Sequence, residues 1–364
     1  MPISQKNSQK SHYGTKEANR IYRLHQRPHN SMGCCLENIP EWVTIGYRMP
    51  LFFFLSGIFF RAKPFKDFLI RRINTLIIPF ICWMLITASY YFLKYDILAP
   101  IIGIQHEPFN PSLLDMTKLF NVHNETVHDP LLINPAMWFL ISLPCVQIIF
   151  WGINFFLKKK ILPILLICTL LHICGIILFI KYDINGLFYI GWTLRYTIYY
   201  ALGAIIGPLL MQYTQTPKHR IGIICFSIPA IILLNRIHIP YDHSALQILI
   251  LNVGILCFIP IIFAIFQYIP RIKISKGLSF FGKNSLVILA THWTLMDVFR
   301  VLIEKGLKQT FDPHIYYCCL FIFICIASFV LIIIIVNKYF PILGGKKDLI
   351  KLMPKRNAIP EIAK

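Results

Sequence analysis

The chain has 364 residues, of which 56% are hydrophobic and only 14% are charged, and its mean hydropathy is +0.62. This composition excludes an ordinary soluble globular protein and is typical of a multi-pass helical membrane protein. The net charge of +20 does not indicate nucleic-acid binding, because Lys and Arg fall mainly between apolar runs and at both termini, where they set membrane topology.

Apolar runs long enough, or nearly long enough, to cross a bilayer follow one another along the chain, since about 20 residues span the hydrocarbon core. They cover residues 41–60, 75–93, 131–157, 161–180, 187–211, 221–236, 244–269, 284–304 and 315–337. We therefore expect an all-α fold, a polytopic transmembrane helical bundle of about nine helices. A single membrane domain over 41–340 would follow a polar, basic segment (1–40), expected to be disordered or mis-assigned, and precede a basic tail (341–364).

The distribution of Lys and Arg predicts the orientation of this bundle. One set of alternating connections and the C-terminal tail together hold 21 Lys and Arg, and the other connections hold 7. The basic set comprises 61–72, 158–160, 214–220, 270–283 and the tail from 338. The positive-inside rule places this set in the cytoplasm, which predicts a cell inner (cytoplasmic) membrane protein with a cytoplasmic C-terminus. The long acidic loop from Tyr95 to Asn134 then faces outward, where an extracytoplasmic substrate could be met.

The N-terminal segment breaks this alternation. Residues 1–40 hold six Lys and Arg and no apolar run, yet alternation from the basic loop at 61–72 places them outside. Either the run at 41–60 does not span fully, or the chain lacks an initial helix. The eleven cysteines show neither metal-ligand spacing nor a disulfide pattern, so we interpret them as small core residues and expect no metal site.

The hairpin over residues 46–80 contains polar groups that apolar length alone does not require. Arg48 and Ser56 fall inside the first apolar run, and five basic residues follow it. The glycine after Ser56 permits close backbone approach, and nothing like a nucleophile elbow surrounds this serine.

Four segments together resemble successive landmarks of the integral-membrane acyltransferase 3 family, in the family's order. They are RMPLFFFLSG (48–57), FLIRRINTLIIPF (68–80), NPAMWFL (134–140) and FFGKNSLVILATHW (280–293). The resemblance covers roughly residues 42–340 and is greatest to the fucose 4-O-acetylase-like branch. It implies an O-acyltransferase, most simply an O-acetyltransferase, that moves an acyl group from acyl-CoA to a hydroxyl of a cell-surface sugar or polysaccharide precursor.

The resemblance also implies roles for individual residues. Arg72 matches the first position of the family's cytoplasmic Arg-x-x-Arg pattern, whereas Thr75 occupies the second. A cation there suits the phosphates of a CoA thioester, although positive-inside bias alone also explains Arg71 and Arg72. The Ser56-Gly57 pair serves either helix packing or a thioester tail threading past it.

His292 matches a histidine late in the family's chain. Its imidazole could donate to a substrate hydroxyl or carbonyl, or it could be an interhelical hydrogen-bonding group. Arg195 must face a partner or a wet cavity, and Trp138 is an interface anchor or a ligand-stacking ring; His172 has no motif around it and is interpreted as structural. His292 is thus the candidate catalytic residue. The candidate acyl-CoA- or substrate-binding residues are Arg48, Ser56, Gly57, Arg72, Trp138 and Arg195.

One departure from the family concerns the catalytic base. The family carries an Arg and, about ten residues later, a His in its first transmembrane helix, and no apolar helix here matches it. Arg20 and His29 have a similar spacing, but their segment is polar and contains Pro28, so we transfer the role to neither His25 nor His29.

Two alternatives to an active enzyme stay open. They are a truncated, catalytically inactive family member and a polytopic transporter or flippase, although the inverted repeats and broken helices of a transporter are not found. For the enzyme we expect acyl-CoA as co-substrate and no permanently bound cofactor. The expected partners are the lipid bilayer, acyl-CoA and a sugar or glycan acceptor, with no nucleic acid.

Overall fold

The computed structural model describes residues 41–101, 122–123, 134, 137–182, 184–186, 189–236, 245–267, 275–303 and 315–350. The expectation of disorder for residues 1–40 falls outside these residues. The chain divides into two units, one made of Gly46–Met296 and Phe329–Lys364 and the other of Met1–Ile45 and Asp297–Ser328. Every contact discussed below lies within the first unit.

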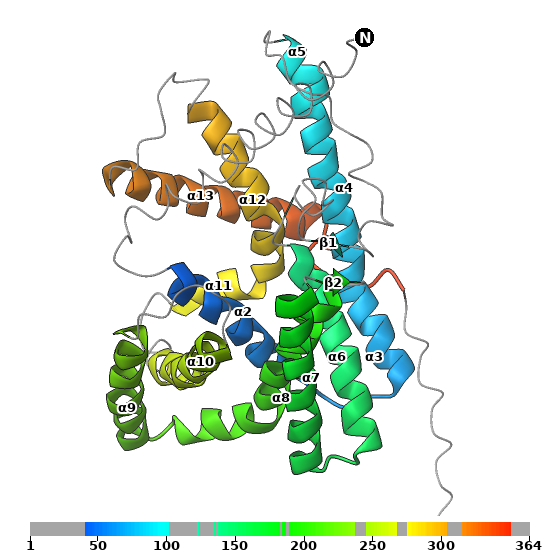
Figure 1. Cartoon of the computed structure of the whole chain (residues 1–364). Coiled ribbons are helices and arrows are strands. Elements are labelled where there is room, and N and C mark those ends of the chain that lie inside the picture. The colour runs from blue at the N-terminus through cyan, green and yellow to red at the C-terminus, as the bar shows by residue number, and fades with distance from the viewer. Residues whose placement is uncertain are drawn as a thin grey trace, which may run out of the picture. The chain divides into compact units, whose positions relative to one another are not determined.

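Each of the nine predicted apolar runs contains a helix (Figure 1). These helices are α2 (Glu41–Ile58), α4 (Ile78–Phe92), α6 (Trp138–Phe156), α7 (Ile161–Tyr182), α8 (Ile190–Tyr213), α9 (Pro217–Arg236), α10 (Ala245–Phe266), α12 (Ser285–Val301) and α13 (Ile315–Tyr339). Among the described residues, six helical stretches are long and apolar enough to cross a membrane, and three shorter helical segments are apolar. The predicted all-α polytopic fold is confirmed.

The basic connection after α2 is shorter than the sequence predicted. Helix α3 (Phe65–Arg72) begins directly after Pro64 and continues without a break through η2 (Ile73–Ile77), α4, η3 (Leu93–Leu98) and α5 (Ala99–Ile101), where η marks π-helical turns. Proline favours a helix start, and Asp67 in the first turn complements the helix dipole. The 34-residue stretch Phe65–Leu98 is about 50 Å long, so its basic first turns can stay outside the hydrocarbon core.

Other elements are short. Helix α11 (Ser275–Lys283) precedes α12, and two strands, β1 (Val122–His123) and β2 (Ile184–Gly186), pair antiparallel with Val122 opposite Gly186. The sequence did not predict these strands, because two- and three-residue strands leave no detectable alternation of apolar and polar residues.

Glycines bring α2 and α8 into backbone contact. A Cβ added to Gly57 would lie 2.1 Å from the Tyr200 carbonyl oxygen, and one added to Gly203 would lie 1.9 Å from the Phe54 carbonyl oxygen. Gly207, four residues after Gly203, leaves room for the Ile58 side chain. This small-xxx-small spacing allows close approach of membrane helices, and it fixes α2 against α8.

The residues after α13 fold back onto the start of the domain. The buried Asn74 side chain donates through Nδ2 to the Ile350 carbonyl oxygen (2.8 Å), and its Oδ1 accepts from the backbone N–H groups of Ile350 (2.9 Å) and Leu349 (3.2 Å). Trp83 Nε1 donates to the Leu343 carbonyl oxygen at 3.0 Å. Residues 340–350 are therefore anchored on η2 and α4.

A polar cluster fixes the same segment to α12 and α13. Lys346 Nζ donates to Asn284 Oδ1 at 2.6 Å and to Asn337 Oδ1 at 2.7 Å, and Asn337 Nδ2 donates to Asn284 Oδ1 at 3.0 Å. Gly345 adopts a left-handed φ of 64° against the Thr75 carbonyl oxygen, where a Cβ would lie 2.7 Å away, so this turn requires glycine.

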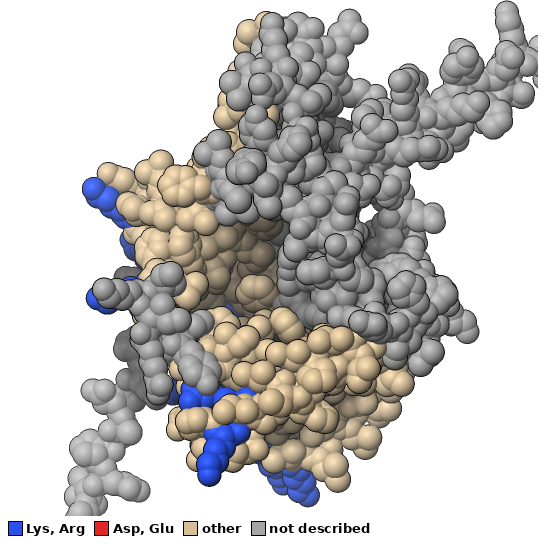
Figure 2. All heavy atoms as spheres, turned by 90° about the vertical axis from the view of Figure 1, so that its left-hand side faces the viewer, with Lys and Arg blue, Asp and Glu red and all other residues tan. Residues whose placement is uncertain are grey.

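The surface agrees with a lipid-facing protein. On the face seen in Figure 2 the described side chains are almost all uncharged, and the Lys and Arg side chains gather in its left and lower parts. Large apolar side chains such as Leu162 and Phe226 are exposed on α7 and α9, as expected where a helix contacts acyl chains rather than water.

Candidate active site

A small cavity of about 180 Å³ lies among α2, η2, α6 and α12. Its lining is apolar apart from two serines: Met49, Phe52, Ser56, Leu76, Phe139, Leu140, Leu143, Ser285, Leu286 and Leu289. Three of the four segments quoted for the family resemblance supply the helices around it, and the fourth supplies Leu76. Of the described candidate residues selected in the sequence analysis, Ser56 is the one that lines this cavity.

Ser56 and Gly57, although adjacent in the sequence, lie on different faces of α2. Ser56 lines the cavity, whereas Gly57 contacts the backbone of Tyr200 and Ala204 on α8. Of the two interpretations of the pair, helix packing fits Gly57, and exposure to a ligand fits Ser56.

His292 lies on α12 and is not itself among the residues that line the cavity. It is seven residues after Ser285 and three after Leu289, so it continues the helix face that lines the cavity. Its Nδ1 lies 2.8 Å from the Leu289 carbonyl oxygen and 3.2 Å from that of Ile288. Because a carbonyl only accepts hydrogen bonds, Nδ1 carries the proton, and in a neutral imidazole Nε2 is then the acceptor. This tautomer can take a proton from a hydroxyl.

Asn134, which the sequence analysis did not select, is buried against α12. It is fully buried, and its Nδ2 donates to the Ala290 carbonyl oxygen of α12 at 2.7 Å. Its Oδ1 is buried and has no hydrogen-bond partner within the described part of the chain. A buried, unpaired amide oxygen is costly, which marks it as an acceptor for a water or a substrate group.

Arg72 ends α3 at the point where the π-helical turn η2 begins. Its guanidinium carbon lies 5.1 Å from the centre of the Phe68 ring, and its Nε is buried without a partner among the described residues. It also interacts electrostatically with Tyr200, whose fully buried hydroxyl is similarly unpaired in the described structure. π-helical turns are frequent at functional sites, and this one starts directly after the cation.

Two further polar side chains, those of Thr75 and Gln147, have different surroundings. Thr75, at the second position of the family's Arg-x-x-Arg pattern, donates its hydroxyl to the Arg71 carbonyl oxygen at 2.8 Å and supplies no second cation. Gln147, four residues after the cavity-lining Leu143 on the same face of α6, is buried, and its Oε1 has no partner in the described structure. A polar residue within an apolar run was the signal that could have identified it.

Trp138 and Arg195 belong to a different group. The Trp138 ring lies 5.4 Å from that of Trp192 and 5.8 Å from that of Tyr196, and the Arg195 guanidinium carbon lies 5.6 Å from the Trp192 ring centre. Neither residue lines the cavity, although the Trp138 and Phe139 rings are 6.3 Å apart. Trp138 and Arg195 therefore lie outside the lining of the cavity that contains Ser56.

Arg48 and His172 are two further residues that the sequence analysis discussed. The Arg48 side chain lies outside the described residues. His172 is held at both nitrogens: Nδ1 contacts the Arg195 carbonyl oxygen, and Asn252 Nδ2 donates to Nε2 at 3.2 Å. Tyr199 in turn donates to Asn252 Oδ1. These contacts fit the structural interpretation of His172. Within the described residues, no three His, Cys, Asp or Glu side chains are grouped so as to hold a metal ion.

The fold and the cavity together define a multi-pass helical membrane protein with buried polar groups around a small interhelical site. Comparison with known families gives one match, described as an acyltransferase domain of the acyltransferase 3 family, over residues 24–333. The chain therefore belongs to this family of membrane acyltransferases. The matched range includes His25 and His29, which lie outside the described residues. No curated protein and no solved structure matches the chain.

Proposed function

We propose that this protein transfers an acyl group, most simply acetyl, from acyl-CoA to a hydroxyl of a cell-surface sugar or polysaccharide precursor. Family membership supports acyl transfer, and the observation that carries the finer proposal is the cavity, which is lined by residues of α12, the helix of His292, and by Leu76, four residues after Arg72. A cavity of about 180 Å³ is smaller than the roughly 300–1,000 Å³ typical of whole-ligand pockets. It suits the reacting acyl end of a thioester, with CoA and the sugar extending from it.

The chemistry assigns His292 as the base. The acceptor hydroxyl gives its proton to Nε2 while its oxygen attacks the thioester carbonyl carbon, and the tetrahedral intermediate collapses by breaking the C–S bond. The proton then passes to the departing CoA sulfur, so the products are an ester and free CoA thiol. Arg72 binds a phosphate of CoA, and the Asn134 Oδ1 orients the acceptor hydroxyl.

The topology required by this reaction follows the charge distribution. Arg72 lies at the start of the helix that leaves the basic, cytoplasmic connection, where acyl-CoA is available. The acceptor sugar would approach from the opposite side through the region of the long loop at 95–134. This arrangement requires insertion in the cytoplasmic membrane with the C-terminus inside.

The test is transfer of radiolabelled acetyl from acetyl-CoA to endogenous glycan in membranes that contain the chain. Replacement of a general base typically costs about 10²- to 10⁴-fold in rate, so His292→Gln should lose transfer to that extent at equal protein amount. His219→Gln, which changes an exposed histidine stacked on Tyr213, is the matched control and should leave the rate unchanged. Arg72→Gln should instead raise the acetyl-CoA concentration required for half-maximal transfer.

Two results would contradict the proposal. Full activity of His292→Gln would show that the base lies elsewhere in the chain. Robust sugar uptake by vesicles without consumption of acyl-CoA would indicate the transporter alternative.

A further inference from the structure

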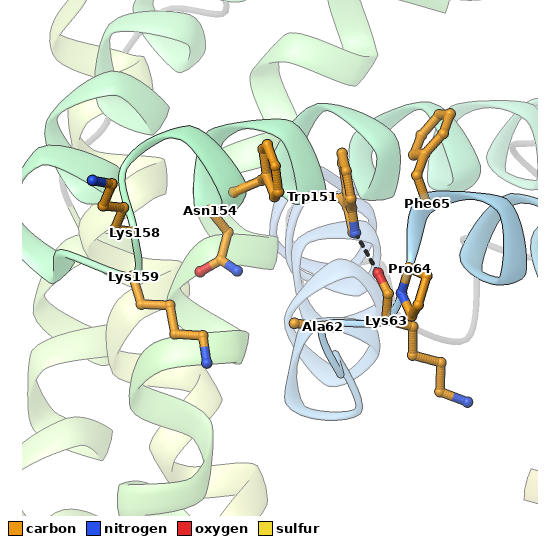
Figure 3. Close-up of a pocket in the computed structure, with 9 residues that line it drawn as sticks. Ala62, Lys63, Pro64, Phe65, Trp151, Asn154, Lys158 and Lys159 are labelled. Atoms are coloured by element: carbon orange, nitrogen blue, oxygen red, sulfur yellow. Dashed lines mark hydrogen bonds between the residues drawn. The ribbon is translucent and has the colours of Figure 1, made fainter. Parts of the chain in front are cut away.

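A second, larger hollow lies away from the cavity, between two basic connections. It has a volume of about 610 Å³ and is formed by the segment before α3, the end of α6 and the turn into α7 (Figure 3). Its lining residues are Ala62, Lys63, Pro64, Phe65, Trp151, Asn154, Phe155, Lys158 and Lys159. None of the residues assigned to acyl transfer above lines it.

The hollow is cationic. Three of its nine lining residues are lysines and none is acidic. The Lys63 and Lys159 side chains extend toward the lower part of the view, the Asn154 amide is drawn above Lys159, and Lys158 points to one edge (Figure 3). Cations beside an amide donor form a site for an anion with several acceptor oxygens, such as a phosphate.

The backbone holds these lysines in an unusual conformation. Lys158 and Lys159 have φ values of 48° and 63°, the left-handed region that costs a non-glycine residue of order 1 kcal/mol or more. Strain of this kind persists where the surroundings impose it and is concentrated at ligand sites. The turn that places Lys159 beside the hollow therefore has an unfavourable backbone energy, which the surrounding structure must offset.

Aromatic rings form an ordered wall of the hollow. Trp151 stacks on Phe155 at 5.2 Å and lies 4.8 Å from the Phe65 ring, and its Nε1 donates to the Lys63 carbonyl oxygen at 3.0 Å. This bond joins the segment before α3 to helix α6 (Figure 3). Tryptophan with an apolar body and a bonded N–H is typical of the membrane–water interface.

The edge of the hollow identifies the kind of ligand. Phe155 is 62% exposed, and the neighbouring Phe156 and Leu162 are each 79% exposed, so an apolar, lipid-facing surface continues directly from the cationic group. A ligand that fits both parts carries a phosphate joined to hydrocarbon tails. We propose that this hollow binds the phosphate headgroup of an anionic phospholipid, with its acyl chains lying along α6 and α7. The site is separate from the proposed acyl-transfer reaction.

The test compares lipid retention by the full chain in lipid nanodiscs that contain phosphatidylglycerol or phosphatidylcholine. Native mass spectrometry after release counts the phospholipids that stay bound. Each lysine near an anionic headgroup contributes about fivefold in affinity, so Lys63→Gln/Lys159→Gln should weaken phosphatidylglycerol retention by up to about 25-fold. Lys218→Gln/Lys276→Gln removes two exposed lysines from other basic connections and should behave as the parent chain does.

A charge-conserving variant separates binding from misfolding. Lys63→Arg/Lys159→Arg should retain phosphatidylglycerol, and the glutamine variant should elute as the parent does in size-exclusion chromatography. Equal retention by the two glutamine variants would overturn the proposal. So would a loss of CoA affinity in Lys63→Gln/Lys159→Gln with lipid retention intact, because the phosphate recognised there would then be that of the acyl donor.

Discussion

Glycine-to-alanine changes should destabilise the protein at the contact between α2 and α8 and stabilise it at an exposed helical position. In Gly203→Ala the new Cβ would lie 1.9 Å from the Phe54 carbonyl oxygen, and real Cβ atoms stay at least 3.0 Å from such atoms. The helices must therefore move by about 1.1 Å, the difference between these two distances. Since the obstacle is backbone and not a flexible side chain, no rotamer change relieves it. Overpacking of this kind costs about 1–3 kcal/mol or more.

Gly222→Ala is the matched control. Gly222 lies in α9, and an added Cβ meets nothing within 4 Å, so alanine should stabilise the helix by about 0.5–1 kcal/mol through its higher helix propensity. The two substitutions, chemically identical, are thus expected to change the free energy of unfolding with opposite signs.

The assay is reversible unfolding in mixed micelles followed by circular dichroism, together with acyl transfer at equal folded protein. Because α2 forms one wall of the cavity, a shift of about 1 Å should also lower transfer by roughly 10²-fold. Equal unfolding free energies for Gly203→Ala and Gly222→Ala would refute the close helix contact.

Three further changes test other parts of the structure. Asn74→Leu removes the three hydrogen bonds to Leu349 and Ile350 and should lower the free energy of unfolding by about 1–3 kcal/mol. Limited trypsin digestion would detect this change as faster cleavage after Lys346 and Lys347. An unchanged digestion rate would contradict the anchoring of residues 340–350. Ser56→Leu fills part of the cavity and should abolish most acyl transfer, whereas Ser56→Ala should leave transfer nearly unchanged. If the radiolabel assay found both variants inactive, the Ser56 hydroxyl would have a chemical role. His172→Phe removes the acceptor of the Asn252 Nδ2 group and should lower the midpoint temperature of thermal unfolding without changing transfer per folded molecule. A loss of transfer at an unchanged midpoint would contradict the structural role of His172.

The sequence predicted the spanning elements well because hydrocarbon thickness imposes a length on them, whatever their partners. It placed the start of α3 too late, since the basic residues around Lys66 and Arg71 looked like a loop. Pro64 was the overlooked signal of a helix start. The spanning helices could therefore be predicted because the length requirement applies to each apolar segment separately, whatever its neighbours are.

The candidate site was predictable only in part. Ser56 and His292 were selected through short motifs; Ser56 lines the cavity, and His292 lies on α12, which supplies three other lining residues. Asn134, Gln147 and Tyr200 were missed because their burial depends on helices far away in the chain, as the 156-residue separation of Asn134 and Ala290 shows. The spacing of Gly203 and Gly207 was visible, but its partner surface on α2 was not.

The bond between Asn74 and Ile350 joins residues separated by 276 positions. At a synthesis rate of about 5–20 residues per second, Asn74 enters the membrane roughly 14–55 s before its partner leaves the ribosome. During that interval a buried amide has no intramolecular acceptor or donor from the C-terminal segment. Leu349 and Ile350 therefore complete, much later in synthesis, the hydrogen bonding of a helix that was inserted earlier.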